Sequence, residues 1–201
     1  MDEGYIKFNC QLIEAEPIWF EGFDVLNQWR DRLYQMGLIG MYPNKIGFGN
    51  ISIRDGHSRQ FYITGSATGG LAILTEAHYT EVTDYHFKTN SLTCWGPIKA
   101  SSESLTHAAV YLADPTVNAV IHVHHLKLWQ ALLHKIPTTS LEVAYGTPEM
   151  SLEILRLFQE TDLKTAQVLV MGGHQEGIIS FGKNMDEAGR VLAERLKLIE
   201  N

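Results

Sequence analysis

The chain has 201 residues, of which 45% are hydrophobic, enough for one well-packed core, and we expect a single domain over residues 1–201. With 23 acidic against 16 basic residues the formal net charge is -7, which argues against duplex nucleic acid and anionic membranes as partners but leaves a small anionic substrate open. The two cysteines, Cys10 and Cys94, form no Cys-x-x-Cys pattern, which indicates a reducing compartment without a disulfide framework or a thiolate zinc site.

The N-terminal segment predicts a lead-in followed by an amphipathic helix. Residues 1–5 contain no basic region followed by an apolar one, and no stretch approaches a membrane-spanning length, so we expect a cytoplasmic protein. After about Glu21, apolar residues recur at helical spacing over residues 25–36. Gly37 follows where a left-handed cap would end such a helix.

A β-hairpin and a loop of small residues come next. Apolar and polar residues alternate over residues 47–54, Asp55-Gly56 indicates a turn, and residues 61–64 form the returning strand. The loop over residues 64–70 is rich in Gly, Ser and Thr, so its backbone amides and hydroxyls can approach a ligand closely. An ordinary flexible loop has the same composition.

A second strand pair precedes a helix that begins with hydroxyl side chains. Residues 79–83 and 91–95 have the composition of strands. Ser101 and Ser102 stand at the expected N-cap of a helix whose apolar pattern ends near Asp114. A helix N-terminus with two hydroxyls is a ready anion site, although serine is also favoured there for capping alone.

Two histidines lie on one side of the apolar strand predicted over residues 118–124. Side chains two apart on a strand emerge from the same face, so His122 and His124 point together while Ile121 and Val123 point to the other side. Neutral imidazole is a common ligand of zinc, so this pair could supply half of a metal site. The alternative is a pair of hydrogen-bonded core histidines.

The remaining elements alternate between helix and strand. In order, these are a short helix over 126–133, a helix over 148–158 capped by Thr147, a buried strand over 167–171, a turn over 172–177, a strand over 178–181 and a C-terminal helix capped by Asn184. We find no internal repeat and no linker.

A catalytic metal site needs a third ligand and a group that handles protons. His174, which follows a buried strand at a glycine-flanked turn, is the strongest further ligand among the nine histidines. His125 faces away from His122 and His124, so we expect it to pack or hydrogen-bond. His107 lies one turn beyond Glu103 and could support the site indirectly.

Glu103 is the strongest carboxylate candidate for proton transfer. It adjoins two hydroxyls in an otherwise uncharged segment. Its alternative role is to stabilise the helix dipole, since an acid in the first helical turn is favourable without any catalytic function.

Taken together, these motifs resemble the class II aldolase/adducin family, with fuculose-phosphate aldolase as the type of enzyme implied. The resemblance covers most of the chain after the first helix. It rests on Gly49-Asn50-Ile51-Ser52, the loop over residues 64–70, Ala100-Ser101-Ser102-Glu103, His122-Val123-His124 and Gly173-His174.

The resemblance implies a fold, a cofactor and an assembly. The fold is a three-layer α/β (α-β-α) domain with a central, largely antiparallel sheet flanked by helices. The metal is divalent, usually zinc, held by His122, His124 and His174, and the assembly is commonly a homotetramer with sites at subunit interfaces.

The resemblance also implies residue roles and a reaction. Glu103 acts as the acid and base, and Asn50, Ser66, Ser101 and Ser102 hold a substrate phosphate, with Thr68 competing for the place of Ser66. The implied activity is that of a metal-dependent lyase which cleaves a small, phosphorylated hydroxy-carbonyl compound through a metal-stabilised enediolate.

Two departures from the family pattern keep other functions open. The segment between His124 and Tyr145 is shorter than in the sugar-phosphate aldolases, so Tyr145 is not assigned the role of their catalytic tyrosine. The late turn reads His174-Gln175-Glu176-Gly177 where many relatives have His followed directly by Gly, so Glu176 can approach the site. The alternatives are an epimerase, a dehydratase of the methylthioribulose-phosphate type, or a non-catalytic oligomerisation module like the adducin head.

Overall fold

The computed structural model of the protein describes residues 6–17 and 19–199. Residues 1–5, from which the absence of a targeting signal is predicted, lie outside the described part of the chain. Residues 200–201, the last two of the predicted domain, also lie outside it. Within the described residues, no helix has the length and apolar character needed to cross a bilayer.

An eight-stranded sheet forms the centre of the molecule, with the strand order β1-β7-β6-β5-β4-β8-β10-β9. All neighbouring pairs in it are antiparallel except β1 with β7, which confirms the largely antiparallel sheet expected from the sequence. The strands are β1 (Asn9–Glu14), β4 (Asn50–Arg54), β5 (Phe61–Thr64), β6 (Tyr79–His86), β7 (Ser91–Gly96), β8 (Ala119–His124), β9 (Val168–Val170) and β10 (Gly177–Gly182). A separate short ladder pairs β2 (Gly40–Met41) with β3 (Gly47–Phe48).

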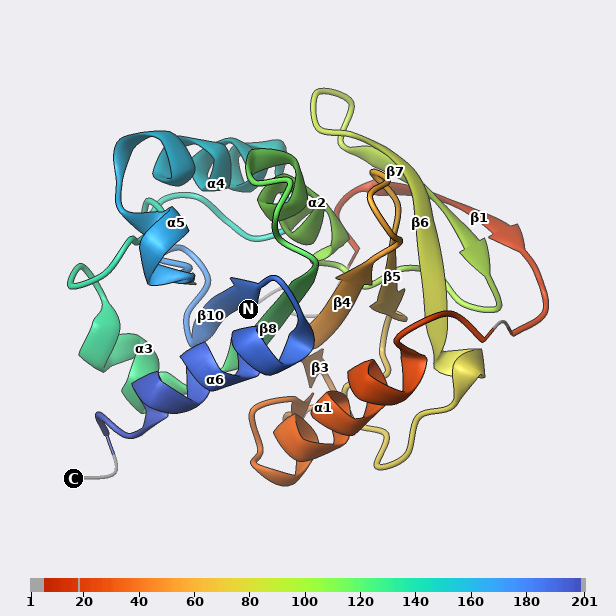
Figure 1. Ribbon diagram of the computed structural model, residues 1–201, viewed down its shortest axis with the longest axis horizontal. Helices are drawn as coiled ribbons and strands as arrows, with labels where there is room; N and C mark the ends of the chain where they lie inside the picture. Colours follow the sequence, from red (N-terminus) through yellow and green to blue (C-terminus); the bar gives the residue numbers. More distant parts are fainter. Residues whose placement is uncertain (1–5, 18, 200–201) are drawn as a thin grey trace.

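Helices cover both faces of the sheet and make the three-layer architecture (Figure 1). On one face lie α1 (Phe23–Gln35), α3 (Leu126–Leu132) and α6 (Met185–Leu196), and on the other lie α2 (Ser104–Ala113), α4 (Pro148–Glu160) and α5 (Leu163–Ala166). A short 3₁₀ helix, η1 (Glu76–His78), precedes β6. The side chains of β8 divide between these layers, because Ile121 and Val123 join the core beneath α1 and α6 while Val120 joins the core beneath α2.

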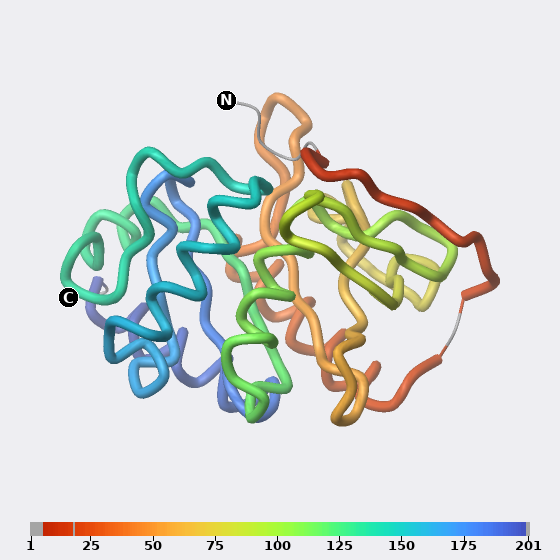
Figure 2. The backbone as a smooth tube through the Cα atoms, turned by 90° about the horizontal axis from the view of Figure 1, so that it is seen from above, coloured from red at the N-terminus to blue at the C-terminus, as the bar shows by residue number. Residues whose placement is uncertain are grey.

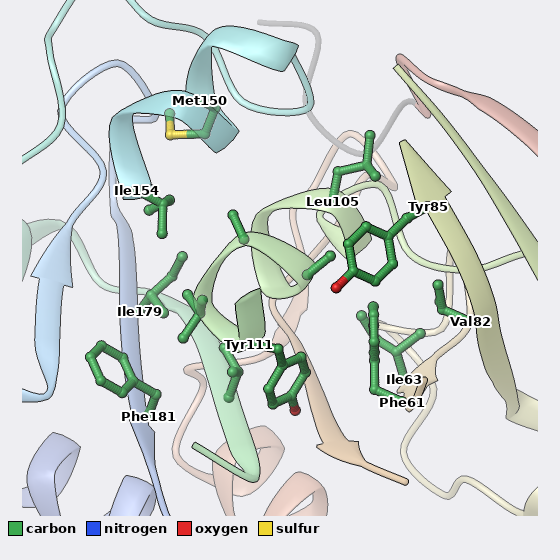
Figure 3. Close-up of a cluster of buried hydrophobic side chains, with 14 of the residues drawn as sticks. Phe61, Ile63, Val82, Tyr85, Leu105, Tyr111, Met150, Ile154, Ile179 and Phe181 are labelled. Carbon is green, nitrogen blue, oxygen red and sulfur yellow. The ribbon is translucent and has the colours of Figure 1, made fainter. Parts of the chain in front are cut away.

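Helix α2 is largely enclosed, and the predicted acid, Glu103, immediately precedes it. Residues 104–111 are all buried. Figure 3 shows Leu105 and Tyr111 of this helix between residues of β5 and β6 on one side and residues of α4 and β10 on the other. Each large apolar side chain buried in this way contributes about 1.5–3 kcal/mol. The start of α2 is therefore held on a rigid support.

The sequence predicts most element positions, and the differences include those at β1, α2 and β6. β1 falls in the predicted lead-in, because a mostly exposed edge strand lacks a buried face to mark it, and only pairing with β7 defines it. Figure 2 shows this strand, in red, along the outer edge of the molecule. Helix α2 begins at Ser104, so Glu103 rather than a serine occupies the N-cap, without a side-chain capping bond. β6 extends to His86, beyond the predicted end of that strand.

Two side-chain details also follow from tertiary packing. His125 is the N-cap of α3, and its Nδ1 accepts a hydrogen bond from the backbone amide of Leu128 at 3.1 Å, in accord with the non-ligand role expected for it. Cys10 and Cys94 are both free thiols, yet their Sγ atoms lie 3.6 Å apart because β1 and β7 are neighbours.

Candidate metal centre

His122 and His124 extend from the same face of β8, toward α2. All six residues of this strand are buried, and the two rings have centroids 4.9 Å apart. β8 is an interior strand paired with β4 and β10, so its backbone, and with it the spacing of the two rings, is fixed from both sides. The period of the strand alone sets this pair, as the sequence predicts.

His174 reaches the same place from the turn between β9 and β10. A Cβ atom at Gly173 would overlap the carbonyl oxygen of Val143, and one at Gly177 would lie 3.2 Å from the His174 ring. At Gly173, only glycine lets the turn pass this close to its neighbour. The candidate ligand atoms of His122, His124 and His174 all lie within 4.8 Å of one another.

Burial keeps the strand histidines neutral. Removal from water lowers the pKa of His122 and of His124 well below the ordinary value, and the nearby His174 lowers both further. A neutral imidazole offers a nitrogen lone pair, which is the form that binds a metal. The two rings are thus prepared to act as ligands at neutral pH.

The donor set fits a divalent cation. The Nε2 atom of His122 is buried and has no hydrogen-bond partner among the described residues. A buried polar atom without a partner lowers the stability of a folded protein. Three imidazoles around one point match the protein ligands of a catalytic zinc site, which leaves a further position open for substrate or water.

Glu103 lies at the edge of this cluster. Its side chain is 2% exposed, its Oε2 accepts a hydrogen bond from Thr106 at 2.7 Å, and its Oε1 lies 3.7 Å from Nδ1 of His174. His107, which the sequence places one turn further along, bonds through Nδ1 to the hydroxyl of Ser52 at 2.7 Å. Because Ser52 belongs to β4, this bond fixes α2 against the sheet.

All the residues that the sequence analysis assigns to the site line one cavity of about 190 Å³. They are Asn50, Ser66, Ser101, Ser102, Glu103, His122, His124 and His174. The cavity is smaller than the roughly 300–1,000 Å³ of pockets for drug-sized ligands. It therefore suits a small molecule of a few carbon atoms.

The structure distinguishes the two hydroxyls that compete within the loop over residues 64–70. The Thr68 hydroxyl donates to the carbonyl oxygen of Gly65 at 2.8 Å and is buried, so it closes the loop on itself. Ser66 is half-buried and lines the cavity. This arrangement favours Ser66 as the ligand-facing hydroxyl.

Three further residues at the site have no role predicted from the sequence. Lys45 is the one lysine or arginine among its described lining residues, and it has a left-handed backbone (φ 67°). Tyr145 stacks on the ring of His174, with centroids 4.6 Å apart. The phenol of Tyr42 lies 2.9 Å from Nδ1 of His124. None of these positions has a local pattern that marks it, because each reaches the site only through folding.

Arg30 supports the loop from behind. Its guanidinium is 1% exposed and donates to the carbonyl oxygens of Thr68 and Gly69, both at 3.1 Å, and of Ala72 at 3.4 Å. Burial lowers its pKa, yet an arginine in a protein keeps its proton. A fixed positive charge thus lies behind a loop suited to bind an anion.

The chain is similar to known proteins over most of its length. Residues 43–199 match the family described as Class II Aldolase and Adducin N-terminal domain. An L-fuculose 1-phosphate aldolase has a similar fold, with a TM-score of 0.67, 15% identity and coverage of 90% of this chain and 84% of that one.

Two further solved structures share the fold. The L-fuculose-1-phosphate aldolase from Thermus thermophilus has a TM-score of 0.57 at 21% identity, covering 86% of this chain and 85% of that one. YgbL from Escherichia coli, whose name leaves aldolase, epimerase and decarboxylase open, has a TM-score of 0.61 at 18% identity, covering 88% and 86%. The chain belongs to the class II aldolase and adducin family as a divergent member, and it has the metal-dependent, aldolase-type function of the lyases in that family.

Proposed function

We propose that this protein is a zinc-dependent aldolase that cleaves a small phosphorylated hydroxy-carbonyl compound in the cytoplasm. The observation that carries the proposal is the convergence of three buried histidines and the Glu103 carboxylate at one cavity. The names of the similar structures, which include fuculose-phosphate aldolases, support the substrate class.

The hydroxyl-rich part of the cavity would hold the phosphate. Ser66 lies on the loop that Arg30 supports, and Ser101 and Ser102 lie just before α2, so these hydroxyls border the cavity from two sides. Lys45 adds a positive charge to the same lining. Hydrogen bonds to a charged phosphate are worth about 1.5–3 kcal/mol each, which makes such a set selective for phosphorylated ligands.

The histidines would hold the metal, and Asn50 would orient one of them. A bound divalent cation acts as a Lewis acid that stabilises negative charge developing on substrate oxygens. In this structure the amide nitrogen Nδ2 of Asn50 lies 3.3 Å from Nδ1 of His122. With Nε2 of His122 as a metal ligand, Nδ1 would carry the ring proton, so the Asn50 amide would turn over to offer its oxygen to the ring and leave its NH₂ to donate to substrate.

Glu103 would move the proton. Its carboxylate lies beside the histidine cluster, and the Thr106 hydroxyl fixes one of its oxygens. A positioned carboxylate can take a proton from a substrate hydroxyl when the carbon–carbon bond breaks and return one to the carbon that carries the developing charge. Such positioned proton transfer contributes about 10²–10⁴ in rate.

An epimerase is the second candidate. The same charge stabilisation serves epimerisation by bond cleavage and re-formation, and the segment between His124 and Tyr145 is shorter than in the sugar-phosphate aldolases, with no residue matched to their catalytic tyrosine. YgbL, whose name leaves aldolase, epimerase and decarboxylase open, is a structural neighbour. Product analysis separates the two, because an epimerase returns a stereoisomer and an aldolase returns two shorter compounds.

We also propose that the protein acts as a homotetramer, as the family commonly does. Near the glycine-rich loop, Met41, Leu71 and Ile73 are exposed by 53%, 42% and 76%. A neighbouring subunit that covered them would bury apolar surface close to the cavity. Sedimentation analysis of the purified protein measures the assembly directly, and a monomer at all concentrations would contradict it.

The metal and the reaction are tested together. Purified protein is analysed for bound metal and incubated with phosphorylated ketoses, L-fuculose 1-phosphate among them, with detection of released aldehyde. We expect stoichiometric divalent metal and cleavage of at least one phosphorylated ketose. His122→Ala should lose the metal and the activity, because two imidazoles cannot complete the site.

The matched control is His86→Ala, which removes a surface imidazole that pairs with Asp84. It should retain metal and activity. Wild-type protein that binds no divalent metal, or His122→Ala protein that binds it as well as the wild type, would overturn the proposal.

A further inference from the structure

The hydroxyl of Tyr42 connects a candidate metal ligand to a carboxylate. It lies 2.9 Å from Nδ1 of His124 and donates to Oε2 of Glu176 at 2.7 Å. The three residues come from the turn after β2, from β8, and from the turn before β10. Folding alone brings them together.

The directions of these two hydrogen bonds follow from proton counting. A carboxylate only accepts hydrogen bonds, so the single phenolic proton of Tyr42 is donated to Glu176. The phenol oxygen is then left to accept from His124, so the ring proton of His124 sits on Nδ1. The Nε2 lone pair of His124 therefore points away from Tyr42, in the form a metal requires.

The surrounding structure fixes both partners. The backbone of Glu176 has a left-handed conformation (φ 73°), which is uncommon for a residue with a side chain, and its carbonyl oxygen accepts from the amide of His125 at 3.0 Å. The Tyr42 ring packs against Phe48, with centroids 4.5 Å apart, and Phe48 packs against His124 at 5.4 Å. A strained backbone held by its neighbours often marks a functional position.

We propose that Tyr42 and Glu176 are positioning residues that select the metal-binding form of His124 and fix its ring. This inference rests on the proposed metal centre, and it adds two residues to it. Glu176 lies in the same turn as His174, so one turn supplies both a candidate metal ligand and the acceptor for Tyr42. Partners of this kind typically change metal affinity by about 10–100-fold.

The experiment measures metal binding directly, in the full-length protein. Metal-free wild type, Tyr42→Phe, Glu176→Ala and Glu176→Gln are titrated with Zn²⁺ against a chromophoric chelator, and the visible absorption of their Co²⁺ forms is recorded. Tyr42→Phe and Glu176→Ala should weaken Zn²⁺ binding by about 10–100-fold and change the Co²⁺ spectrum. Glu176→Gln keeps an acceptor for the phenol, so it should lose less than Glu176→Ala.

Matched controls separate positioning from general damage. Tyr34→Phe removes a phenol that bonds to the carbonyl oxygen of Gly70, and Glu142→Gln removes an exposed carboxylate. Both should bind Zn²⁺ as the wild type does. Thermal unfolding of each metal-free variant identifies loss of folding, and Glu176→Ala keeps the proposal testable if Tyr42→Phe fails to fold.

The outcomes distinguish this inference from the proposed function. If Tyr42→Phe and Glu176→Ala bind Zn²⁺ with the affinity of the wild type and give the wild-type Co²⁺ spectrum, the positioning role is overturned and the proposed metal centre is retained. Wild type that binds neither Zn²⁺ nor Co²⁺ would overturn both.

Discussion

The Oε1 atom of Glu103, at the start of α2, lies 3.7 Å from Nδ1 of His174, in the turn before β10. If this carboxylate moves the proton, Glu103→Gln should slow exchange between solvent deuterium and the carbon-bound hydrogens of dihydroxyacetone phosphate by at least about 100-fold. The three histidines remain, so Zn²⁺ content should stay near that of the wild type. Proton exchange is followed by NMR.

The control for this prediction is Glu149→Gln, which changes an exposed acid in the first turn of α4. It should leave the exchange rate unchanged. A Glu103→Gln protein that exchanges as fast as the wild type would exclude Glu103 as the proton carrier.

The two serines before α2 should discriminate phosphate from hydroxyl. The double variant Ser101→Ala, Ser102→Ala should bind dihydroxyacetone phosphate at least about tenfold more weakly, because a hydrogen bond to a charged group is worth about 1.5–3 kcal/mol. Binding of unphosphorylated dihydroxyacetone should change little. Calorimetry measures the affinity for both ligands, and Ser140→Ala is the control. An equal loss of affinity for the two ligands would contradict the phosphate role.

Arg30 should be required for an ordered anion loop. Arg30→Met removes the donor from the carbonyl oxygens of Thr68 and Gly69, and each buried acceptor left unbonded costs about 1–3 kcal/mol. We expect a lower free energy of unfolding in urea and faster amide exchange over residues 66–70. Arg32→Met, on the exposed side of α1, should change neither, and an Arg30→Met protein of wild-type stability would refute the prediction.

His107 should make the metal-free protein sensitive to acid. Burial lowers its pKa from 6.5 to about 3, so between these values the unfolded chain binds a proton that the folded protein does not. Its contribution to stability is complete above pH 6.5 and is lost as the pH falls toward 3, by up to about 1.4 kcal/mol per pH unit.

His107→Gln should therefore reduce the pH dependence of the free energy of unfolding between pH 6.5 and about 4 by about one proton. The buried His122 and His124 keep a remaining slope, since their pKa values are lowered as well. Urea unfolding of the metal-free protein at several pH values measures it. The control is His134→Gln, which changes an exposed residue and should keep the wild-type slope. A His107→Gln protein that keeps the wild-type slope would contradict the prediction.

The local parts of the fold could be predicted from the sequence. Helix and strand periods place α1 and α6, and Thr147 before Pro148 marks the start of α4, where its hydroxyl accepts from the amide of Met150 at 3.3 Å. The edge strand β1 could not be predicted, because its partner β7 is distant in sequence and neither face of β1 is well buried.

At the candidate site, the sequence by itself determined the relationships between residues that are close together along the chain. The two-residue period of a strand places His122 beside His124, and the hydroxyls of Ser101 and Ser102 precede a helix start. These relationships depend only on local backbone geometry, so they can be read without the fold.

Only the tertiary structure decided what surrounds these residues. The interior position of β8 brings His174 and Glu103 to the strand histidines, and the turn after β2 brings Tyr42 to both His124 and Glu176. Arg30 likewise acts on a loop that is distant in sequence. No local period encodes such contacts, because they arise when separate elements pack on one sheet and share its buried face.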